Sequence, residues 1–208
     1  MDGYGTEKEQ LEAIRKWWAA NGTWLLVGLV VGFGSLFGWR YWQDSQLVRA
    51  ENASANYENF LVFVEQNDAD LALSTGKALV AEFPGSPYAG LTALHMARLA
   101  LRGGDPDGAE SHIAWARENA DTPYIMRVAE LRDLRLKVTL GRAAEAVDAL
   151  PDLLDEDAPV ALELAGDIQA ATGDLDGAVA TYDRILATPG LDPADRELVE
   201  LKIDAVGR

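Results

Sequence analysis

The chain has 208 residues, 49% of them hydrophobic, which leaves room for one ordinary domain and a short additional segment. Its 18 Lys and Arg against 34 Asp and Glu give a formal net charge of −16, which argues against nucleic-acid binding because phosphate backbones bind through Lys and Arg. The absence of cysteine excludes disulfides, thiol catalysis and Cys-based zinc sites.

The first segment, residues 1–22, is predicted to be a tail that contains an amphipathic helix. We expect this helix to lie on the membrane surface with its tryptophans toward the lipid; the alternative is a helix that docks on a loop of a partner. Asn21-Gly22 predicts that the helix stops before the next segment. The apolar side chains that recur at helical spacing are Leu11, Ile14, Trp17 and Trp18.

Residues 23–42 are predicted to form a single transmembrane helix. No residue from Trp17 to Trp39 is charged, and about 20 apolar residues suffice to cross a lipid bilayer. A cleaved signal peptide would begin with basic residues and end at a small-residue site, whereas here acidic residues precede the segment. We therefore expect an uncleaved anchor. The aromatic residues expected at the two membrane interfaces are Trp17, Trp18, Trp24, Trp39, Tyr41 and Trp42.

Two pairs of glycines lie within this segment at a spacing of four residues. That spacing lets a second membrane helix approach closely, backbone to backbone. We therefore expect a helix-packing face made of Gly28, Gly32, Gly34 and Gly38.

The charges on the two flanks give a weak prediction of orientation. Lys8, Arg15 and Lys16 precede the segment, and Arg40 and Arg49 follow it. Because cytoplasmic flanks are enriched in Lys and Arg, this count slightly favours a cytoplasmic N-terminus.

The third segment, residues 43–208, is predicted to be an all-α repeat domain. Neither Gly nor Pro occurs between Trp39 and Asn67, so the membrane helix is expected to continue to Gln66 as a stalk. A kink near residues 43–45 is the alternative. The apolar stripe along this stalk consists of Leu47, Ala50, Ala53, Tyr57, Phe60, Leu61 and Val64.

The rest of the domain repeats a turn motif. It reads Gly-Asp-Pro-Asp-Gly-Ala at residues 104–109, Gly-Arg-Ala-Ala-Glu-Ala at 141–146 and Gly-Asp-Leu-Asp-Gly-Ala at 173–178, each between two amphipathic patterns. This resembles the tetratricopeptide repeat, a helix-turn-helix unit of about 34 residues. It predicts an α-solenoid of short helices whose concave face binds polypeptides.

Each repeat offers a small residue where its two helices cross and a large one four positions later. A degenerate fourth copy precedes these three and ends near Pro84, and a final helix after Asp192-Pro193 is expected to close the solenoid through Leu198, Leu201 and Ala205. The predicted packing residues are Ala109, Ile113, Ala146, Leu150, Gly166, Ala178 and Tyr182.

Candidates for catalysis or metal binding are few. The two histidines, His95 and His112, lie in no metal-binding pattern. The acidic run at residues 152–157 lacks the alternating ligands and turn glycine of a calcium loop. We predict no catalytic residue, no metal site and no cofactor, so the chain is not expected to be an enzyme.

The N-terminal block containing Ala13-Ile-Arg-Lys-Trp-Trp18, followed by a glycine-containing span that ends in Gly38-Trp-Arg-Tyr-Trp42, resembles the YfgM family of ancillary subunits of the bacterial SecYEG translocon. The resemblance implies an inner-membrane protein with a cytoplasmic N-terminus and a periplasmic repeat domain. It also implies association with SecYEG and a PpiD-like membrane-anchored chaperone, and assistance to nascent secreted polypeptides. It implies no catalytic residues.

Two functions remain open at the level of sequence. The first is an accessory subunit of the translocon that binds a chaperone or an emerging chain through its repeats. The second is a membrane-tethered repeat scaffold for envelope assembly or signalling that is unrelated to secretion, since repeats of this kind serve many functions.

Overall fold

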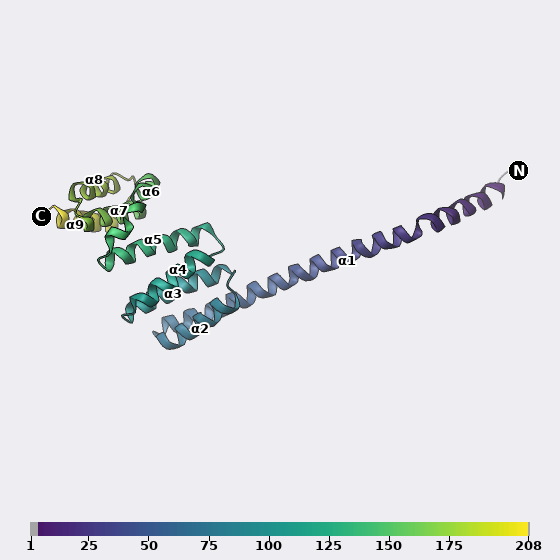
Figure 1. Ribbon diagram of the computed structural model, residues 1–208, viewed down its shortest axis with the longest axis horizontal. Helices are drawn as coiled ribbons and strands as arrows, with labels where there is room; N and C mark the ends of the chain where they lie inside the picture. The colour runs from purple at the N-terminus through teal and green to yellow at the C-terminus, as the bar shows by residue number, and fades with distance from the viewer. Residues whose placement is uncertain (1–3, 208) are drawn as a thin grey trace. The chain divides into compact units, whose positions relative to one another are not determined.

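The computed structural model describes residues 4–207, and their side chains from residue 9 onward. All regular secondary structure within this range is helical, which confirms the predicted all-α class (Figure 1). The chain divides into two compact units, one ending at Asn52 and one beginning at Ala53.

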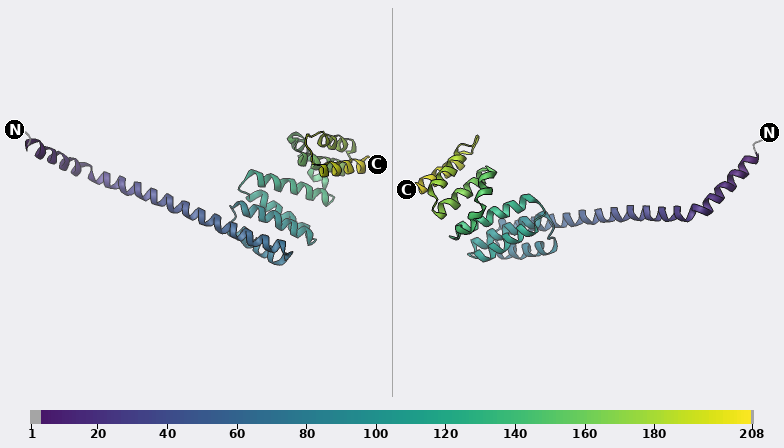
Figure 2. Two further views of the ribbon diagram at one scale, coloured as in Figure 1. Left: turned by 180° about the vertical axis from the view of Figure 1, so that it is seen from behind. Right: turned by 45° about the horizontal axis from the view of Figure 1, so that its top comes forward.

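The first element, α1 (Tyr4–Glu65), passes through the predicted stop at Asn21-Gly22 without a break. That prediction is wrong because both residues are accommodated within the helix. The Asn21 amide donates a hydrogen bond to the Trp17 carbonyl at 3.1 Å, and the Trp18 indole covers Gly22, which is buried. Figure 2 shows that the purple, N-terminal part of α1 bends while remaining helical.

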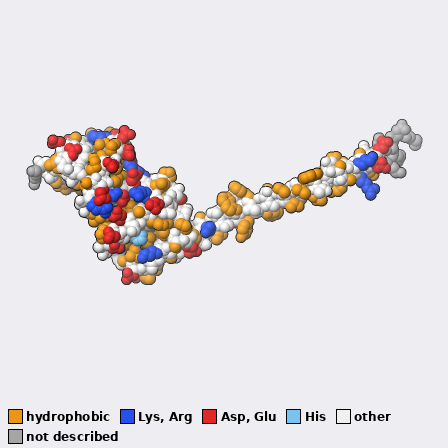
Figure 3. Space-filling model, viewed as in Figure 1, with side chains coloured by type: hydrophobic (Ala, Val, Ile, Leu, Met, Phe, Trp, Pro, Cys, Tyr) orange, Lys and Arg blue, Asp and Glu red, His pale blue; other side chains and the backbone are white. Residues whose placement is uncertain are grey.

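One part of α1 has the character of a membrane helix. It contains a stretch that is long and apolar enough to cross a membrane. The mean hydropathy of this stretch is 1.6, and only 6% of it is buried. Its large apolar side chains are exposed, and Figure 3 shows the middle of the helix free of the charged side chains that cover the repeats. The structure and the sequence therefore agree that one helix near the N-terminus can span a bilayer.

The apolar stripe predicted along the stalk is buried only in its second half. Leu47 and Ala50 are exposed, whereas Ala53 and Phe60 are buried. The change coincides with the boundary between the two units, so the last turns of α1 serve as the first helix of the repeat unit.

The repeat unit pairs successive helices. The end of α1 pairs with α2 (Ala69–Glu82), α3 (Pro87–Arg102) with α4 (Pro106–Asn119), and α7 (Pro159–Thr172) with α8 (Leu175–Leu186). Between them, α5 (Pro123–Thr139) pairs with a 3₁₀ segment η1 (Ala143–Ala149) that runs into α6 (Leu150–Glu156). The last helix is α9 (Pro193–Val206).

The turn within each pair follows one geometry. A residue in the left-handed region, which is Asn67, Gly104, Gly141 or Gly173, precedes the N-cap of the second helix. In three of the turns the N-cap is an Asp whose carboxylate accepts a backbone N–H three residues later, at 2.9 to 3.1 Å. The degenerate copy that begins the repeat unit therefore has the same turn, formed by Asn67 and Asp68, although it lacks the glycine of the other copies.

The copy whose turn lies at residues 141–146 lacks this cap. Arg142 stands where the other turns have Asp, and no side chain caps η1. Its guanidinium turns instead to Glu110 and Glu145. With the first N–H groups unsatisfied by a cap, the chain takes the tighter 3₁₀ form before α6 begins.

The helix pairs share one packing position between a large and a small side chain. In the pair α7 and α8, Gly166 faces Tyr182, and a Cβ on this glycine would overlap the ring. In the first pair the order is reversed, because Phe60 is the large residue and Gly76 the small one. The second pair uses Ala97 with Ile113, whereas the third pair departs from the rule and places two large residues, Leu134 and Leu150, at these positions.

The final helix closes the last cluster with a different face from the predicted one. Val199 is buried against Tyr182 and Ile185, and Ile203 packs beside it, whereas the predicted Leu198, Leu201 and Ala205 are exposed. The side of α9 that carries Val199 and Ile203 is the side that packs on the preceding helices, and Lys202 contacts Glu163 and Asp167 on α7.

Candidate functional site

The first helices of the second and third pairs, α3 and α5, lie side by side and form a groove. The groove has two parts, and Leu94 and Arg132 line both of them. One part, of about 350 Å³, has mainly aliphatic walls formed by Ala97, Leu101, Ile113 and Leu136. The other, of about 120 Å³, is bounded by Leu91, His95, Tyr124, Ile125 and Val128.

Three arginines give the groove its charge. Arg98 lies on α3, and Arg132 and Arg135 lie one turn apart on α5. Arg132 is exposed at the surface of the groove and donates to the Leu94 carbonyl at 3.2 Å. Partial desolvation, reinforced by the like charges of Arg98 and Arg135, lowers the pKa of Arg132. The guanidinium stays charged, so the groove holds a concentrated positive potential.

His95 connects the groove to an aromatic cluster. Its ring meets Phe60 edge-on at 6.0 Å and Tyr57 at 6.4 Å between centroids. Burial first, and then the charges of Arg98 and Arg132, lower the pKa of His95 below its ordinary 6.5. The imidazole is therefore neutral near pH 7 and leaves the arginines as the charged groups of the groove.

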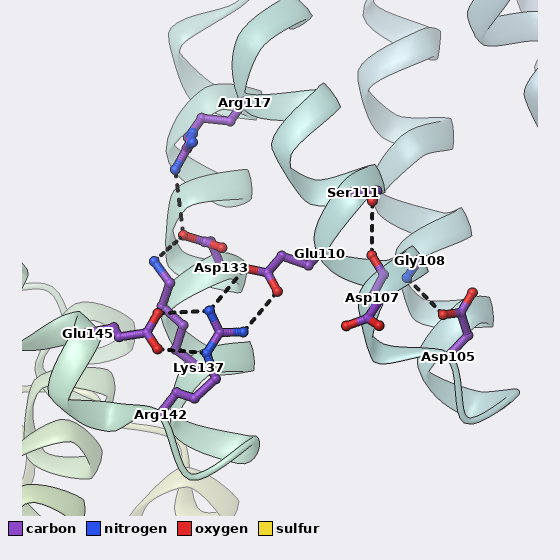
Figure 4. A network of polar contacts seen from close by, with 10 residues as sticks. All are labelled: Asp105, Asp107, Gly108, Glu110, Ser111, Arg117, Asp133, Lys137, Arg142 and Glu145. Atoms are coloured by element: carbon purple, nitrogen blue, oxygen red, sulfur yellow. Dashed lines mark hydrogen bonds and ion pairs between the residues drawn. The ribbon is translucent and has the colours of Figure 1, made fainter.

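Several cations outside the groove are paired with carboxylates. Figure 4 shows Arg142 of the η1 turn between Glu110 of α4 and Glu145, with nitrogen to oxygen distances of 2.9 and 2.8 Å. In the same network, Asp133 accepts Lys137 at 2.9 Å and lies 3.5 Å from Arg117. These contacts tie α4, α5 and η1 together.

A second network joins α7 to α9. Lys202 contacts Glu163 at 2.6 Å and Asp167 at 2.7 Å. Asp167 also accepts the Tyr182 hydroxyl at 2.7 Å, and burial followed by this carboxylate raises the pKa of Tyr182. These groups form their hydrogen bonds and ion pairs with one another, so the network has a structural role.

The predicted packing residues lie between helices. Ala109, Ala146, Ala178, Ile113 and Tyr182 are buried, and Leu150 is half-buried. Leu153, which the sequence reasoning missed, is fully buried one turn later, because the 3₁₀ turn changes which residues face inward. Of these residues, Ile113 also lines the groove.

The predicted membrane residues all belong to α1. A Cβ placed on Gly28, Gly32, Gly34 or Gly38 would meet no atom within 4 Å, so this face is open to a neighbour. The rings of Trp39 and Trp42 lie 5.2 Å apart. All the predicted interface aromatics are exposed, namely Trp17, Trp18, Trp24, Trp39, Tyr41 and Trp42.

The groove arginines were not predicted from the sequence, although the repeat carried a signal. Arg98 and Arg135 stand eleven residues before Ala109 and Ala146, so they occupy the same position in successive repeats. The next repeat has Asp167 there. Aligning the copies position by position would have placed two cations side by side on adjacent first helices.

Comparison with known proteins gives a consistent picture. Residues 15–208 match the family model of a tetratricopeptide repeat-like domain. Proteins named ancillary SecYEG translocon subunit are similar over nearly their whole length, and no solved structure matches significantly. The chain is 29% identical to that of Aggregatibacter actinomycetemcomitans (95% of this chain, 96% of the relative), 28% identical to that of Escherichia coli K12 (98% of each) and 24% identical to that of Neisseria gonorrhoeae (99% and 100%).

Proposed function

Because the chain belongs to the family of tetratricopeptide repeat-like domains, we propose that it is an ancillary subunit of the bacterial SecYEG translocon. The observation that carries the proposal is the near-complete coverage of relatives with that name. A match to the repeats alone would fit many functions. Here the match also includes the apolar segment of α1.

The proposal includes a location. Residues 23–42 cross the inner membrane once, residues 1–22 lie in the cytoplasm, and the domain of residues 43–208 lies in the periplasm. The exposed apolar surface of α1 supports the membrane segment. The larger number of Lys and Arg before this segment supports the orientation.

The two parts of the chain have separate tasks in this proposal. The glycine pairs Gly28 with Gly32 and Gly34 with Gly38 pack against a membrane helix of the translocon, which their open surface favours. The repeat domain binds a PpiD-like chaperone or emerging secreted polypeptides, for which the groove between α3 and α5 is the best-formed surface.

Affinity isolation tests the association. The full-length chain, tagged and expressed at its native level, is purified in mild detergent, and co-purifying proteins are identified by mass spectrometry. We expect SecYEG subunits and a membrane-anchored chaperone. Recovery of neither would overturn the proposal.

A substitution in α1 tests the membrane contact separately. Gly32→Leu places a large side chain on the glycine face and should reduce recovery of SecYEG, because the neighbouring backbone can no longer approach. Val30→Leu is the matched control, since Val30 is already a large exposed residue. Equal recovery with both variants would reject the packing face.

A further inference from the structure

The groove between α3 and α5 has no acidic side chain in its wall, although the chain contains 34 acidic residues. Its lining, within the part of the chain that the structure describes, consists of apolar residues, Thr139, Tyr124, His95 and three arginines. A chain this acidic could readily have placed carboxylates there. The groove is therefore a cationic site within an acidic domain.

The arginines of the groove are also short of partners. Arg117, Arg127, Arg142, Arg184 and Lys202 each contact at least one carboxylate. Among the described residues, no carboxylate lies within ion-pair distance of Arg98 or Arg132. Arg135 has a single contact, with Glu163 at 3.5 Å. Arg98 lies 3.3 Å from the His95 Nδ1 and Arg132 donates to the Leu94 carbonyl. Because a guanidinium has five N–H donors, the remaining donors of Arg98 and Arg132 are available to a ligand.

The surroundings strengthen the attraction for an anion. Arg98, Arg132 and Arg135 lie together in the wall of one pocket, so a carboxylate entering the groove would relieve repulsion between like charges as well as form charge-assisted hydrogen bonds. Apolar walls from Leu94, Leu101 and Leu136 offer contacts to apolar side chains.

We propose that this groove binds an extended polypeptide segment in which acidic side chains alternate with apolar ones. The acidic side chains pair with Arg98, Arg132 and Arg135, and the apolar ones lie against the leucines. From Tyr124 to Thr139 the groove follows roughly 22 Å of α5, which accommodates about seven extended residues. The inference deepens the proposed function and rests on it, because it names the class of polypeptide that the repeat domain takes.

The net charge of the chain restricts the partner further. The whole of the −16 formal charge lies beyond residue 42, so the surface of the repeat domain is negative overall. A nucleic acid or a highly acidic folded protein would be repelled over this surface. An extended segment brings only a few carboxylates, and it brings them directly to the arginines.

Peptide binding tests the inference. The probe is a C-amidated peptide of about seven residues that alternates Leu and Glu and carries fluorescein on its N-terminal amine. Its control has Gln in place of Glu. Binding to the full-length protein in detergent is followed by fluorescence anisotropy. We expect the Glu peptide to bind at least about tenfold more tightly than the Gln peptide, with an affinity that falls as salt is added.

Two double variants locate the site. Arg98→Gln with Arg132→Gln should weaken binding of the Glu peptide about tenfold or more. Arg184→Gln with Arg196→Gln removes the same charge from α8 and α9, outside the groove, and should leave binding nearly unchanged. Arg98→Gln alone, at an exposed position, serves as a second groove variant whose fold is not at risk. Far-UV circular dichroism checks each variant.

Equal binding of the Glu and Gln peptides would overturn the inference. So would equal loss in the two double variants, or binding that appears only when the peptide keeps a free C-terminal carboxylate. The assay contains no translocon. A failure here leaves co-purification with SecYEG untouched, and failed co-purification leaves peptide binding measurable.

Discussion

Gly166 and Gly76 show how a repeat can exchange the large and small residues of one contact. Tyr182 fills the space above Gly166, and its hydroxyl is held by Asp167. Phe60 and Met96 fill the space beside Gly76. Each pair thus combines one large and one small side chain at this contact. Cores tolerate such exchanges best because the total side-chain volume is kept.

Replacing Gly166 with Ala should therefore destabilise the repeat unit by about 1–3 kcal/mol, because the tyrosine ring is buried and cannot move aside. Gly76→Ala should cost less, since its nearest neighbour, at 2.8 Å, is the flexible Met96 thioether. Thermal unfolding of the full-length protein in detergent measures both. Adding Tyr182→Leu to Gly166→Ala should restore part of the loss, and no restoration would contradict this account.

His95 predicts a pH dependence of stability. Burial and the charges of Arg98 and Arg132 lower its pKa in the folded state, so the unfolded chain binds more protons than the folded one. The contribution of this group to the free energy of unfolding is complete above its ordinary pKa of 6.5. It is lost as the pH falls through the lower, folded-state pKa.

His95→Gln should consequently flatten the fall in stability between about pH 7.5 and 5.5, the range in which histidines titrate. The measurement is the unfolding midpoint in urea at each pH. Burial also lowers the pKa of His112, so His112→Gln should flatten the curve further when the two are combined. An unchanged pH profile in the double variant would show that carboxylates, not histidines, control it.

The second helices of the pairs depend on how they begin. Asp68, Asp105 and Asp174 cap α2, α4 and α8, and each follows a residue in the left-handed region. Where Arg142 replaces the aspartate, the corresponding helix starts as 3₁₀ and only becomes α-helical at Leu150. One substitution in the repeat thus explains the irregular third pair.

Loss of a cap should have a measurable cost. Asp174→Ala leaves the Gly177 N–H without its 3.1 Å partner and should destabilise the protein by about 1 kcal/mol, whereas Asp174→Asn should retain most of the stability because Asn caps nearly as well. Chemical unfolding of both variants decides this. If the Asn variant loses as much as the Ala variant, the cap is not the cause.

Exposed apolar surface is distributed unequally over the chain. Many of the large exposed apolar side chains belong to α1 before Asn52, whereas the repeat unit buries four apolar clusters. A water-exposed helix of this kind would aggregate, and a lipid environment removes the problem.

A chain that begins at Gln43 should therefore remain folded and stay in the soluble fraction. The full-length chain should sediment with membranes and resist alkaline extraction. Fractionation followed by circular dichroism of the truncated chain checks both expectations. Sedimentation of the truncated chain with membranes would place the membrane contact in the repeat unit instead.

The sequence by itself determined the features that depend on local pattern. An uncharged apolar run predicts a membrane helix wherever it occurs, and a turn that recurs with its small residue predicts a helix pair, because backbone geometry and side-chain size act over a few residues. The N-terminal block also indicated a likeness to ancillary SecYEG translocon subunits, and proteins of that name are similar over nearly the whole chain.

Only the tertiary structure decided which of two equivalent faces is used and which side chains meet across repeats. On α9, Leu198 with Leu201 and Val199 with Ile203 form two apolar stripes one residue apart, and only the second packs with Tyr182 and Ile185. In the same way, Arg98 and Arg132 are distant in the chain, and the packing of α3 against α5 makes them one site. The physical reason is that these choices are fixed by contacts between distant segments. Helical periodicity carries no information about such contacts.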